Sequence, residues 1–208
     1  MLKVYYADIT PLFQSQCYER NIRLVEATRQ EKIEKYRMEK DRCRSLAAGL
    51  LLGEAVREEG LEMKQVSVTE REGGKPVFVD GEYFFNLSHA GNFAVCAFAD
   101  CEVGVDIEEY SRFTDKEKNE RIATRILTPR EWDHWQTEES GRELLRFWTK
   151  KESFVKMTGK GLGCAFSSID TESGIFYQET DFGEGLHLAV CTLEEQHLPL
   201  RFFQKMIE

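Results

Sequence analysis

The sequence contains no uninterrupted apolar run near the roughly 20 residues that a membrane-spanning helix needs. Residues 1–8 also lack the apolar stretch of an export signal. Basic residues are in deficit, with 28 Lys and Arg against 37 Asp and Glu and a formal net charge of -9. A protein that follows the phosphates of nucleic acid needs an excess of cations, so this balance argues against that class. We expect a cytoplasmic protein that binds neither nucleic acid nor membrane.

Disulfide and zinc signatures are also missing. The cysteines stand singly with no C-x-x-C pair, which favours reduced, mostly buried thiols over disulfides. The histidines form no metal-ligand spacing with one another or with cysteine, which disfavours zinc. A P-loop and a dinucleotide-binding glycine fingerprint are absent as well. The residues concerned are Cys17, Cys43, Cys96, Cys101, Cys164 and Cys191, and His89, His134, His187 and His197.

The chain does have enough apolar material for a packed core, because 41% of its 208 residues are hydrophobic and 12% are aromatic. Helical patterns are followed by strand patterns twice along the chain, which predicts an α+β fold. Strands are expected over 2–7, 66–68, 84–85, 93–99, 103–108, 175–180, 186–193 and 200–206, and helices within 12–59 and over 114–127, 129–137 and 142–157. The apolar segments 94–98 and 189–193 are similar, which alone is weak evidence of duplication.

Two acidic residues, Asp106 and Glu108, stand two apart on the expected strand 103–108. Side chains at this spacing point to the same face of a strand. Two adjacent carboxylates repel each other unless solvent, a shared proton or a cation relieves the repulsion, and a hard divalent cation is a natural partner. The alternative is a solvated, acidic strand end.

Glu152 interrupts the apolar stripe of the helix expected over 142–157, between Trp148 and Val155. Burial of that carboxylate is costly without a partner. Lys156 lies one turn further on and can form an intrahelical ion pair with it. The sharper hypothesis is that Glu152 adds a third oxygen ligand to a metal held by Asp106 and Glu108, and three carboxylates suit magnesium.

Ser88 and His89 lie between two expected apolar strands. Adjacent residues of an extended chain point apart and no G-x-S-x-G elbow is present, so a serine–histidine nucleophile is disfavoured. Hydrogen bonding to a ligand phosphate fits better, and stabilisation of a turn is the alternative. Lys75, Lys156 and Lys160 are available as cations for an anionic ligand, although each taken singly is typical of solvated surface lysine.

Taken in order, these segments resemble the 4′-phosphopantetheinyl transferases of the surfactin-synthetase-activating (Sfp) type. The resemblance covers roughly residues 29–162. Its motifs are Gly74-Lys75-Pro76, Asn86-Leu87-Ser88-His89, Gly104-Val105-Asp106-Ile107-Glu108, Trp148 to Lys156, and Gly159-Lys160-Gly161-Leu162. It implies a pseudo-dimeric fold in which two similar α+β halves, residues 1–103 and 104–208, build one site between them, and it implies a monomer.

The resemblance also implies an activity. Such enzymes move the phosphopantetheine arm of coenzyme A to a serine of an apo acyl or peptidyl carrier protein, release adenosine 3′,5′-bisphosphate and require Mg2+. Asp106, Glu108 and Glu152 match the metal ligands. The positions matched to coenzyme A contacts are Arg44, Ser45, Lys75, Ser88, His89 and Lys156, with Arg29 and Lys32 as looser matches. We expect His89 near the 3′-phosphate and Lys156 near the pyrophosphate.

The attacking serine must lose a proton, and Glu152 and Glu131 are both candidate acceptors. A metal-bound water that relays the proton is a further possibility. Two other functions compete with the transferase: a non-catalytic coenzyme A-binding regulatory homologue, and a magnesium-dependent phosphohydrolase that breaks down coenzyme A without a carrier.

Overall fold

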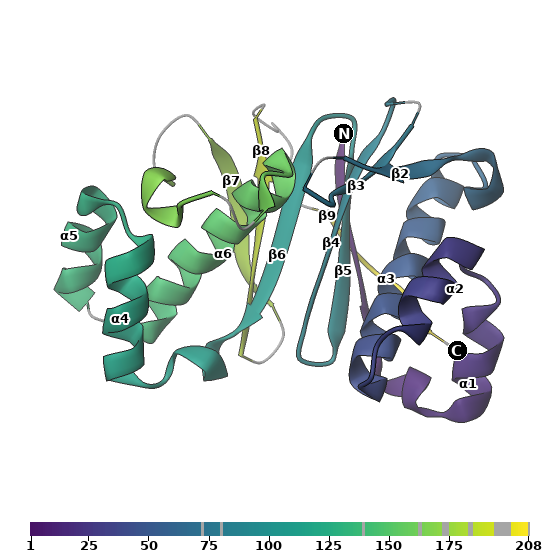
Figure 1. Cartoon of the computed structure of the whole chain (residues 1–208), viewed down its shortest axis with the longest axis horizontal. Helices are drawn as coiled ribbons and strands as arrows, with labels where there is room; N and C mark the ends of the chain where they lie inside the picture. The colour runs from purple at the N-terminus through teal and green to yellow at the C-terminus, as the bar shows by residue number, and fades with distance from the viewer. Residues whose placement is uncertain are drawn as a thin grey trace.

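A computed structural model describes residues 1–71, 73–79, 81–138, 140–161, 164–171, 175–182, 185–193 and 201–207. Two sheets stand side by side in the middle of the molecule, and helices cover them on opposite outer sides (Figure 1). The α+β class and the order of elements agree with the sequence-based prediction. No helix within these residues is long and apolar enough to cross a membrane.

The first half forms a helical layer on a sheet. Its α3 packs on β1, β4 and β5 and presents Leu46, Ala47 and Leu51, all buried, to the core. A 3-10 turn, Thr10–Phe13, separates β1 from α1. The elements are β1 (Leu2–Asp8), α1 (Ser15–Ile22), α2 (Ala27–Glu34), α3 (Glu39–Glu58), β2 (Val68–Glu70), β3 (Pro76–Phe78), β4 (Phe84–Ala90) and β5 (Phe93–Ala99).

The second half repeats this plan with α6 laid on β6 and β8. Ser140 caps α6 by accepting a hydrogen bond from the Glu143 amide at 3.0 Å, and Gly159 ends the helix in a left-handed conformation with φ of 70°. The elements are β6 (Val103–Glu109), α4 (Lys116–Ile126), α5 (Pro129–Glu138), α6 (Gly141–Thr158), β7 (Phe176–Phe182), β8 (Leu186–Thr192) and β9 (Arg201–Gln204).

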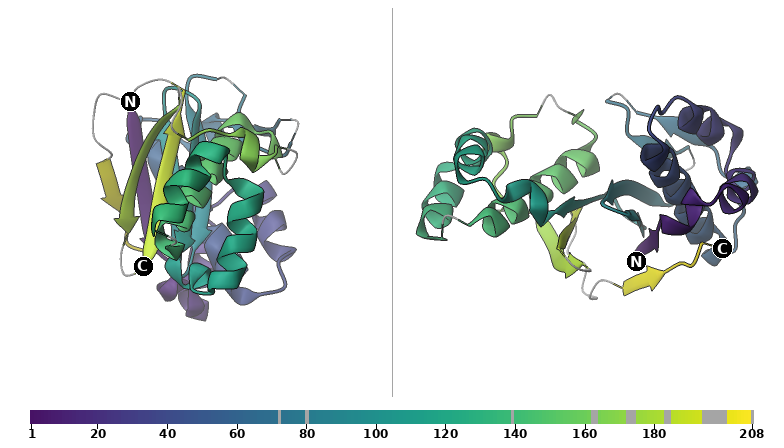
Figure 2. Two further views of the ribbon diagram at one scale, coloured as in Figure 1. Left: turned by 90° about the vertical axis from the view of Figure 1, so that its left-hand side faces the viewer. Right: turned by 90° about the horizontal axis from the view of Figure 1, so that it is seen from below.

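The strand order is β4-β5-β1-β9 in the first sheet and β6-β8-β7 in the second, and β2 and β3 pair separately. Among the strands that the structure describes, all neighbours are antiparallel except β1 and β9, which run parallel with Tyr5 opposite Phe203. Chain order assigns β9 to the second half, but it crosses back and extends the sheet of the first (Figure 2). Hydrophobic periodicity at 200–206 indicates a strand and carries no information about its partner.

The strand β5 holds the two halves together because its two faces pack into two different cores. Successive side chains of a strand point to opposite faces, so Cys96 and Phe98 join the core under α3 while Val95 and Ala97 join a second core shared with the other half. That shared core includes Val105 and Leu188 among others from β6 and β8. The unbroken apolar run 93–99 is therefore buried on both faces, as such runs usually are.

The strand β6 and the helix α6 are in backbone contact, because Gly104 has no side chain. A Cβ at Gly104 would lie 1.9 Å from the Ser153 carbonyl oxygen and 2.5 Å from the Met157 amide nitrogen. Only glycine permits this approach, which brings the residues of the two elements into one site.

Gly104→Ala is expected to lower the free energy of unfolding by about 1–3 kcal/mol, because backbone must move to accept the methyl group. Gly53→Ala is the matched control, since its Cβ would meet Met63 Cγ at an ordinary 3.6 Å and a helical interior favours alanine by roughly 0.5–1 kcal/mol. Urea unfolding of both variants measures the effect, and equal stability would refute the close-contact argument.

Candidate functional site

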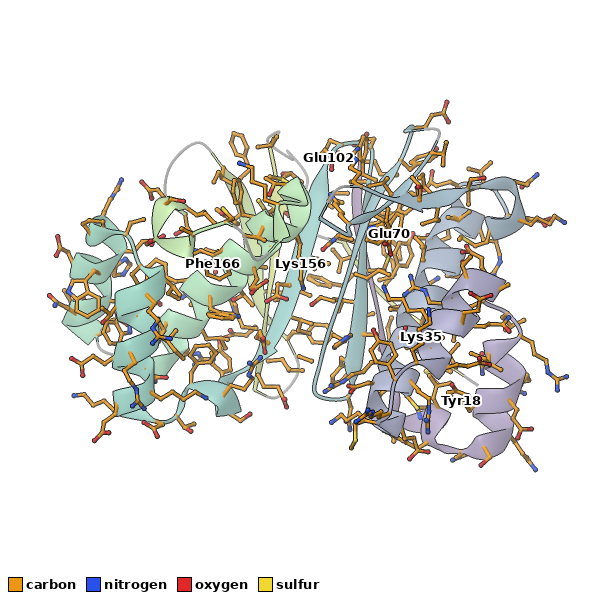
Figure 3. The ribbon with its side chains drawn as sticks, viewed as in Figure 1. Tyr18, Lys35, Glu70, Glu102, Lys156 and Phe166 are labelled. Carbon is orange, nitrogen blue, oxygen red and sulfur yellow. The ribbon has the colours of Figure 1, made fainter. Side chains whose placement is uncertain are left out.

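A cavity of about 950 Å³ lies at the junction of the two halves. Its walls come from α2, α3 and β4 of the first half and from β6 and α6 of the second. Nearly all the polar side chains singled out from the sequence line it, namely Arg29, Lys32, Arg44, Ser45, Ser88, His89, Asp106, Glu108, Glu152 and Lys156. Lys156 stands beside β6 in the middle of the molecule (Figure 3).

Asp106 is the centre of the acidic wall and is almost completely buried, at 4% exposure. Its Oδ1 accepts hydrogen bonds from Ser88 Oγ at 2.9 Å and from Lys156 Nζ at 2.6 Å. Lys156 Nζ also lies 2.8 Å from Ser88 Oγ. These three residues come from β6, β4 and α6, so the triangle joins both halves of the chain. Asp106 Oδ2 is buried and has no hydrogen-bond partner among the described residues.

Glu108 and Glu152 lie in the same wall, and burial and the negative charge of Asp106 raise the pKa of both carboxyl groups. Burial raises the pKa of Glu152, Asp106 and Glu108 raise it further, and Lys156 opposes them. Burial also raises the pKa of Glu108, although its ion pair with Arg112 works in the opposite direction. Three carboxylates thus crowd together beside two cations, the Lys156 ammonium and the Arg112 guanidinium, and a further cation would relieve their repulsion.

The acidic wall contains carboxylate oxygens of the kind that bind magnesium, but they are not arranged as a complete metal site. Within the described part of the chain, no three His, Cys, Asp or Glu side chains are already arranged to hold a metal ion. Oδ2 of Asp106 is nevertheless a buried oxygen that accepts from no donor among the described residues, and hard carboxylate oxygens are the ligands that Mg2+ prefers. The donor set therefore fits magnesium, with Lys156 beside it.

The opposite wall is basic and hydroxylic. Arg44 on α3 donates from Nε and Nη2 to the Gly91 carbonyl oxygen at 3.2 and 2.8 Å and pairs with Asp41, so its guanidinium is held in place. Ser45 Oγ is buried and has no partner within the described residues. A fixed cation beside an unsatisfied hydroxyl suits an anionic oxygen ligand.

The side chain of His89 is exposed while that of its neighbour Ser88 is buried, because successive residues of β4 point to opposite faces of the strand. The strand continues from Phe84 to Ala90, so both residues lie on a strand and not in a turn. Desolvation by the surrounding protein lowers the pKa of His89, and Arg44 and Lys156 lower it further. A phosphate bound beside the ring would raise the pKa of His89 again.

Lys75, expected to contact coenzyme A, does not line the cavity. It is buried, at 6% exposure, and its ammonium donates to Glu102 and to two backbone carbonyl oxygens. The motif predicted that the Lys75 ammonium binds the ligand, whereas in the structure this ammonium binds Glu102 and backbone carbonyl oxygens of the protein itself. Lys160, the other cation considered, is exposed and outside the cavity lining.

Glu131, the alternative proton acceptor, is also outside the cavity. Glu131 Oε2 lies 2.6 Å from Lys151 Nζ, and neither side chain is exposed. Its oxygens further accept from the Thr128 amide and from Thr171. Burial alone would raise the pKa of Glu131, but these donors, Lys151 first, bring it below its usual value. Glu131 is a structural partner of α6 and is not carried forward as a proton acceptor.

Asn86 has a role that its motif did not reveal. Its Oδ1 accepts a hydrogen bond from the Val105 amide at 2.9 Å, which links β4 of the first half to β6 of the second. Arg112 was also missed as the partner of Glu108. The amide of Asn86 directly after the apolar pair Phe84-Phe85 signals the first, and the i,i+4 spacing of Arg112 from Glu108 signals the second.

The sequence is similar to family models and to known proteins that are described as phosphopantetheinyl transferases. A family model for "4'-phosphopantetheinyl transferase, N-terminal" matches residues 13–101, and one for the "4'-phosphopantetheinyl transferase superfamily" matches residues 102–199. The two matches meet just before β6. The chain belongs to the 4′-phosphopantetheinyl transferase superfamily, as the Sfp-type resemblance predicted.

Similar relatives include 4′-phosphopantetheinyl transferase Sfp of Bacillus subtilis (strain 168), which is 27% identical over 212 residues, or 91% of this chain and 92% of the relative. Another 4′-phosphopantetheinyl transferase of Bacillus subtilis is 29% identical, over 83% of this chain and 84% of its own length. The 4′-phosphopantetheinyl transferase psf-1 of Bacillus pumilus is 30% identical, over 76% of this chain and 75% of its own length.

Glu131→Gln is expected to cost about 3–5 kcal/mol of unfolding free energy at pH 7, because Lys151 would keep a buried charge without its counterion. The pKa of Glu131 is lowered on folding, so its stabilisation is present above the unfolded pKa and is lost as the pH falls through the folded pKa. The difference between wild type and variant should therefore shrink in acid.

Urea unfolding at pH 7 and at progressively lower pH measures this difference. Asp133→Asn, on the exposed face of the same helix, is the control and should leave stability unchanged. A Glu131→Gln protein as stable as wild type would contradict the assignment of a structural ion pair.

Proposed function

We propose that this chain moves the 4′-phosphopantetheine group of coenzyme A to a serine hydroxyl of an apo acyl or peptidyl carrier protein. The observation that carries this proposal is that Asp106, Glu108 and Glu152 line the same cavity as Arg44 and His89. Coenzyme A presents a pyrophosphate and a 3′-phosphate, so its anionic half needs cations at two places. Membership in the transferase superfamily supports the same reaction.

The reaction exchanges one bond to phosphorus for another. The serine oxygen of the carrier attacks the phosphorus that bears the pantetheine arm, and the bond from that phosphorus to the bridging pyrophosphate oxygen breaks. The bridging oxygen leaves with adenosine 3′,5′-bisphosphate, and the serine proton passes to a base. Lys156, held at the centre of the cavity by Asp106 and Ser88, is suited to bind the pyrophosphate by charge-assisted hydrogen bonds.

Magnesium would be held by Asp106, Glu108 and Glu152 and would neutralise charge on the pyrophosphate. Oδ2 of Asp106, which has no hydrogen-bond partner in the described part of the chain, supports this assignment. Ser88 and Lys156 occupy only Oδ1 of that carboxylate, so they fix its orientation while the other oxygen stays available. His89 and Arg44 would bind the 3′-phosphate, and Ser45 would donate a hydrogen bond to the same group.

For the proton of the carrier serine, Glu152 is the acceptor that the geometry favours. It lines the cavity, whereas Glu131 is enclosed in its ion pair with Lys151.

We further propose that the protein works as a monomer in the cytoplasm. One chain supplies both walls of the cavity, so a second copy is not needed to complete it. Cys17, Cys43, Cys96 and Cys191 are buried thiols, which suits a reducing compartment.

Intact-protein mass spectrometry of an apo carrier incubated with the protein, coenzyme A and Mg2+ tests the proposed activity. We expect the carrier to gain the mass of one phosphopantetheine group, with loss of the gain under chelator. Asp106→Asn and Glu152→Gln should each reduce the rate by at least roughly 100-fold, because both act on the developing charge. Asp133→Asn, exposed on α5, is the control and should retain the wild-type rate.

Tight binding of coenzyme A without modification of any carrier would contradict the transferase and favour a regulatory homologue. Breakdown of coenzyme A without a carrier would instead identify a phosphohydrolase.

His89→Ala is expected to weaken coenzyme A binding by roughly tenfold or more, the usual scale for a hydrogen bond to a charged group. The pKa of His89 is lowered in the free protein, and a bound phosphate would raise it, so binding should take up a proton and strengthen as the pH falls. Calorimetry in two buffers of different ionisation enthalpy measures that uptake. If the variant keeps both the affinity and the proton uptake of wild type, His89 does not contact the phosphate.

A further inference from the structure

Lys75 lies just before β3, in the segment that joins β2 to β3, and its ammonium contacts two other segments of the chain through three acceptors. Lys75 Nζ donates to Glu102 Oε2 at 2.8 Å, to the Val103 carbonyl oxygen at 3.2 Å and to the Met157 carbonyl oxygen at 2.6 Å. A lysine ammonium has three donors. All three are therefore used within the protein, and none is left for a substrate phosphate.

The acceptors identify what the ammonium connects. Val103 is the first residue of β6, which carries Asp106 and Glu108, and Met157 is in the last turn of α6, which carries Glu152. Carbonyl oxygens in the last turn of a helix lack intrahelical donors and carry partial negative charge. A buried cation at this point satisfies them and links the two elements that form the acidic wall.

The backbone around Lys75 is fitted to the same helix end. A Cβ at Gly73 would lie 2.1 Å from the Gly159 carbonyl oxygen, and a Cβ at Gly159 would lie 3.4 Å from Lys75 Cβ. The turn of the first half is thus seated directly on the C-terminal cap of α6. Glu102 also pairs with Arg71, so the segment before β6 is tied to the β2–β3 hairpin by two cations.

We propose that Lys75 is a positioning residue, which fixes the end of α6 and the start of β6 to the first half and so sets the spacing of the three carboxylates. This inference rests on the proposed transferase function, and it assigns to the lysine of the Gly74-Lys75-Pro76 motif a role other than contact with coenzyme A. Glu102 contributes to the same positioning role, since it is the counterion of Lys75.

Lys75→Met and Glu102→Gln test the proposal together. Each should lower kcat by roughly 10- to 100-fold, the scale expected when catalytic groups are misplaced by about an ångström. Coenzyme A affinity, measured by calorimetry without carrier, should change by less than about threefold because neither side chain lines the cavity. Lys160→Met is the matched control, an exposed lysine beside the same helix end, and should leave kcat unchanged.

A second readout does not depend on activity. The Gly159 amide donates to the Val155 carbonyl oxygen at 3.0 Å and reports on the last turn of α6. Its hydrogen exchange should accelerate by roughly tenfold or more in Lys75→Met and Glu102→Gln, because local opening becomes easier there. Amides in the middle of α3 should keep their wild-type rates.

Loss of coenzyme A affinity in Lys75→Met, with normal exchange at Gly159, would overturn the proposal and restore direct ligand contact. If Lys75→Met does not fold, the Glu102→Gln variant decides the question. A normal kcat with normal hydrogen exchange at Gly159 in that variant would overturn the proposal. Slower catalysis with unchanged coenzyme A affinity would support it. An inactive wild-type protein would refute the proposed function instead, and the exchange measurement would still decide the role of Lys75.

Discussion

The buried carboxylate of Asp106 is the constraint on which the arrangement of the site depends. A charge at 4% exposure is costly unless it is paired and hydrogen-bonded. Its partners, Ser88 and Lys156, come from β4 and α6, so compensation of this one charge requires three elements from both halves to meet. Glu108 and Glu152 then crowd the same wall with raised pKa values, which leaves a site in need of a further cation.

Apolar packing supplies the frame that this polar junction needs. β5 is buried on both faces, one against α3 and one against the core shared with β6 and β8. Gly104 then lets β6 approach the backbone of α6. The ion pair of Lys75 with Glu102 acts at the end of α6, and that of Lys151 with Glu131 acts along its length. The helix that carries Glu152 and Lys156 is thus fixed by ion pairs and by packing.

Much of this could be predicted from the sequence because periodicity reports directly on local structure. The spacing of Asp106 and Glu108 placed both on one strand face, and the position of Glu152 in an apolar stripe marked it as unusual. All three carboxylates line the cavity. The ion pairs of Lys75 with Glu102 and of Glu131 with Lys151 could not be predicted, because a charged residue in a motif looks the same whether its partner is a ligand or a buried side chain. The parallel pairing of β9 with β1 was also beyond reach, since hydrophobic periodicity does not specify strand partners.

The central claim is that one cavity between the halves binds coenzyme A and magnesium together. A crystal structure with both bound tests it most directly. The account predicts the metal on Asp106, Glu108 and Glu152, the pyrophosphate beside Lys156, and Lys75 still bonded to Glu102 and to the end of α6. A metal held by other residues, or coenzyme A outside this cavity, would contradict the account.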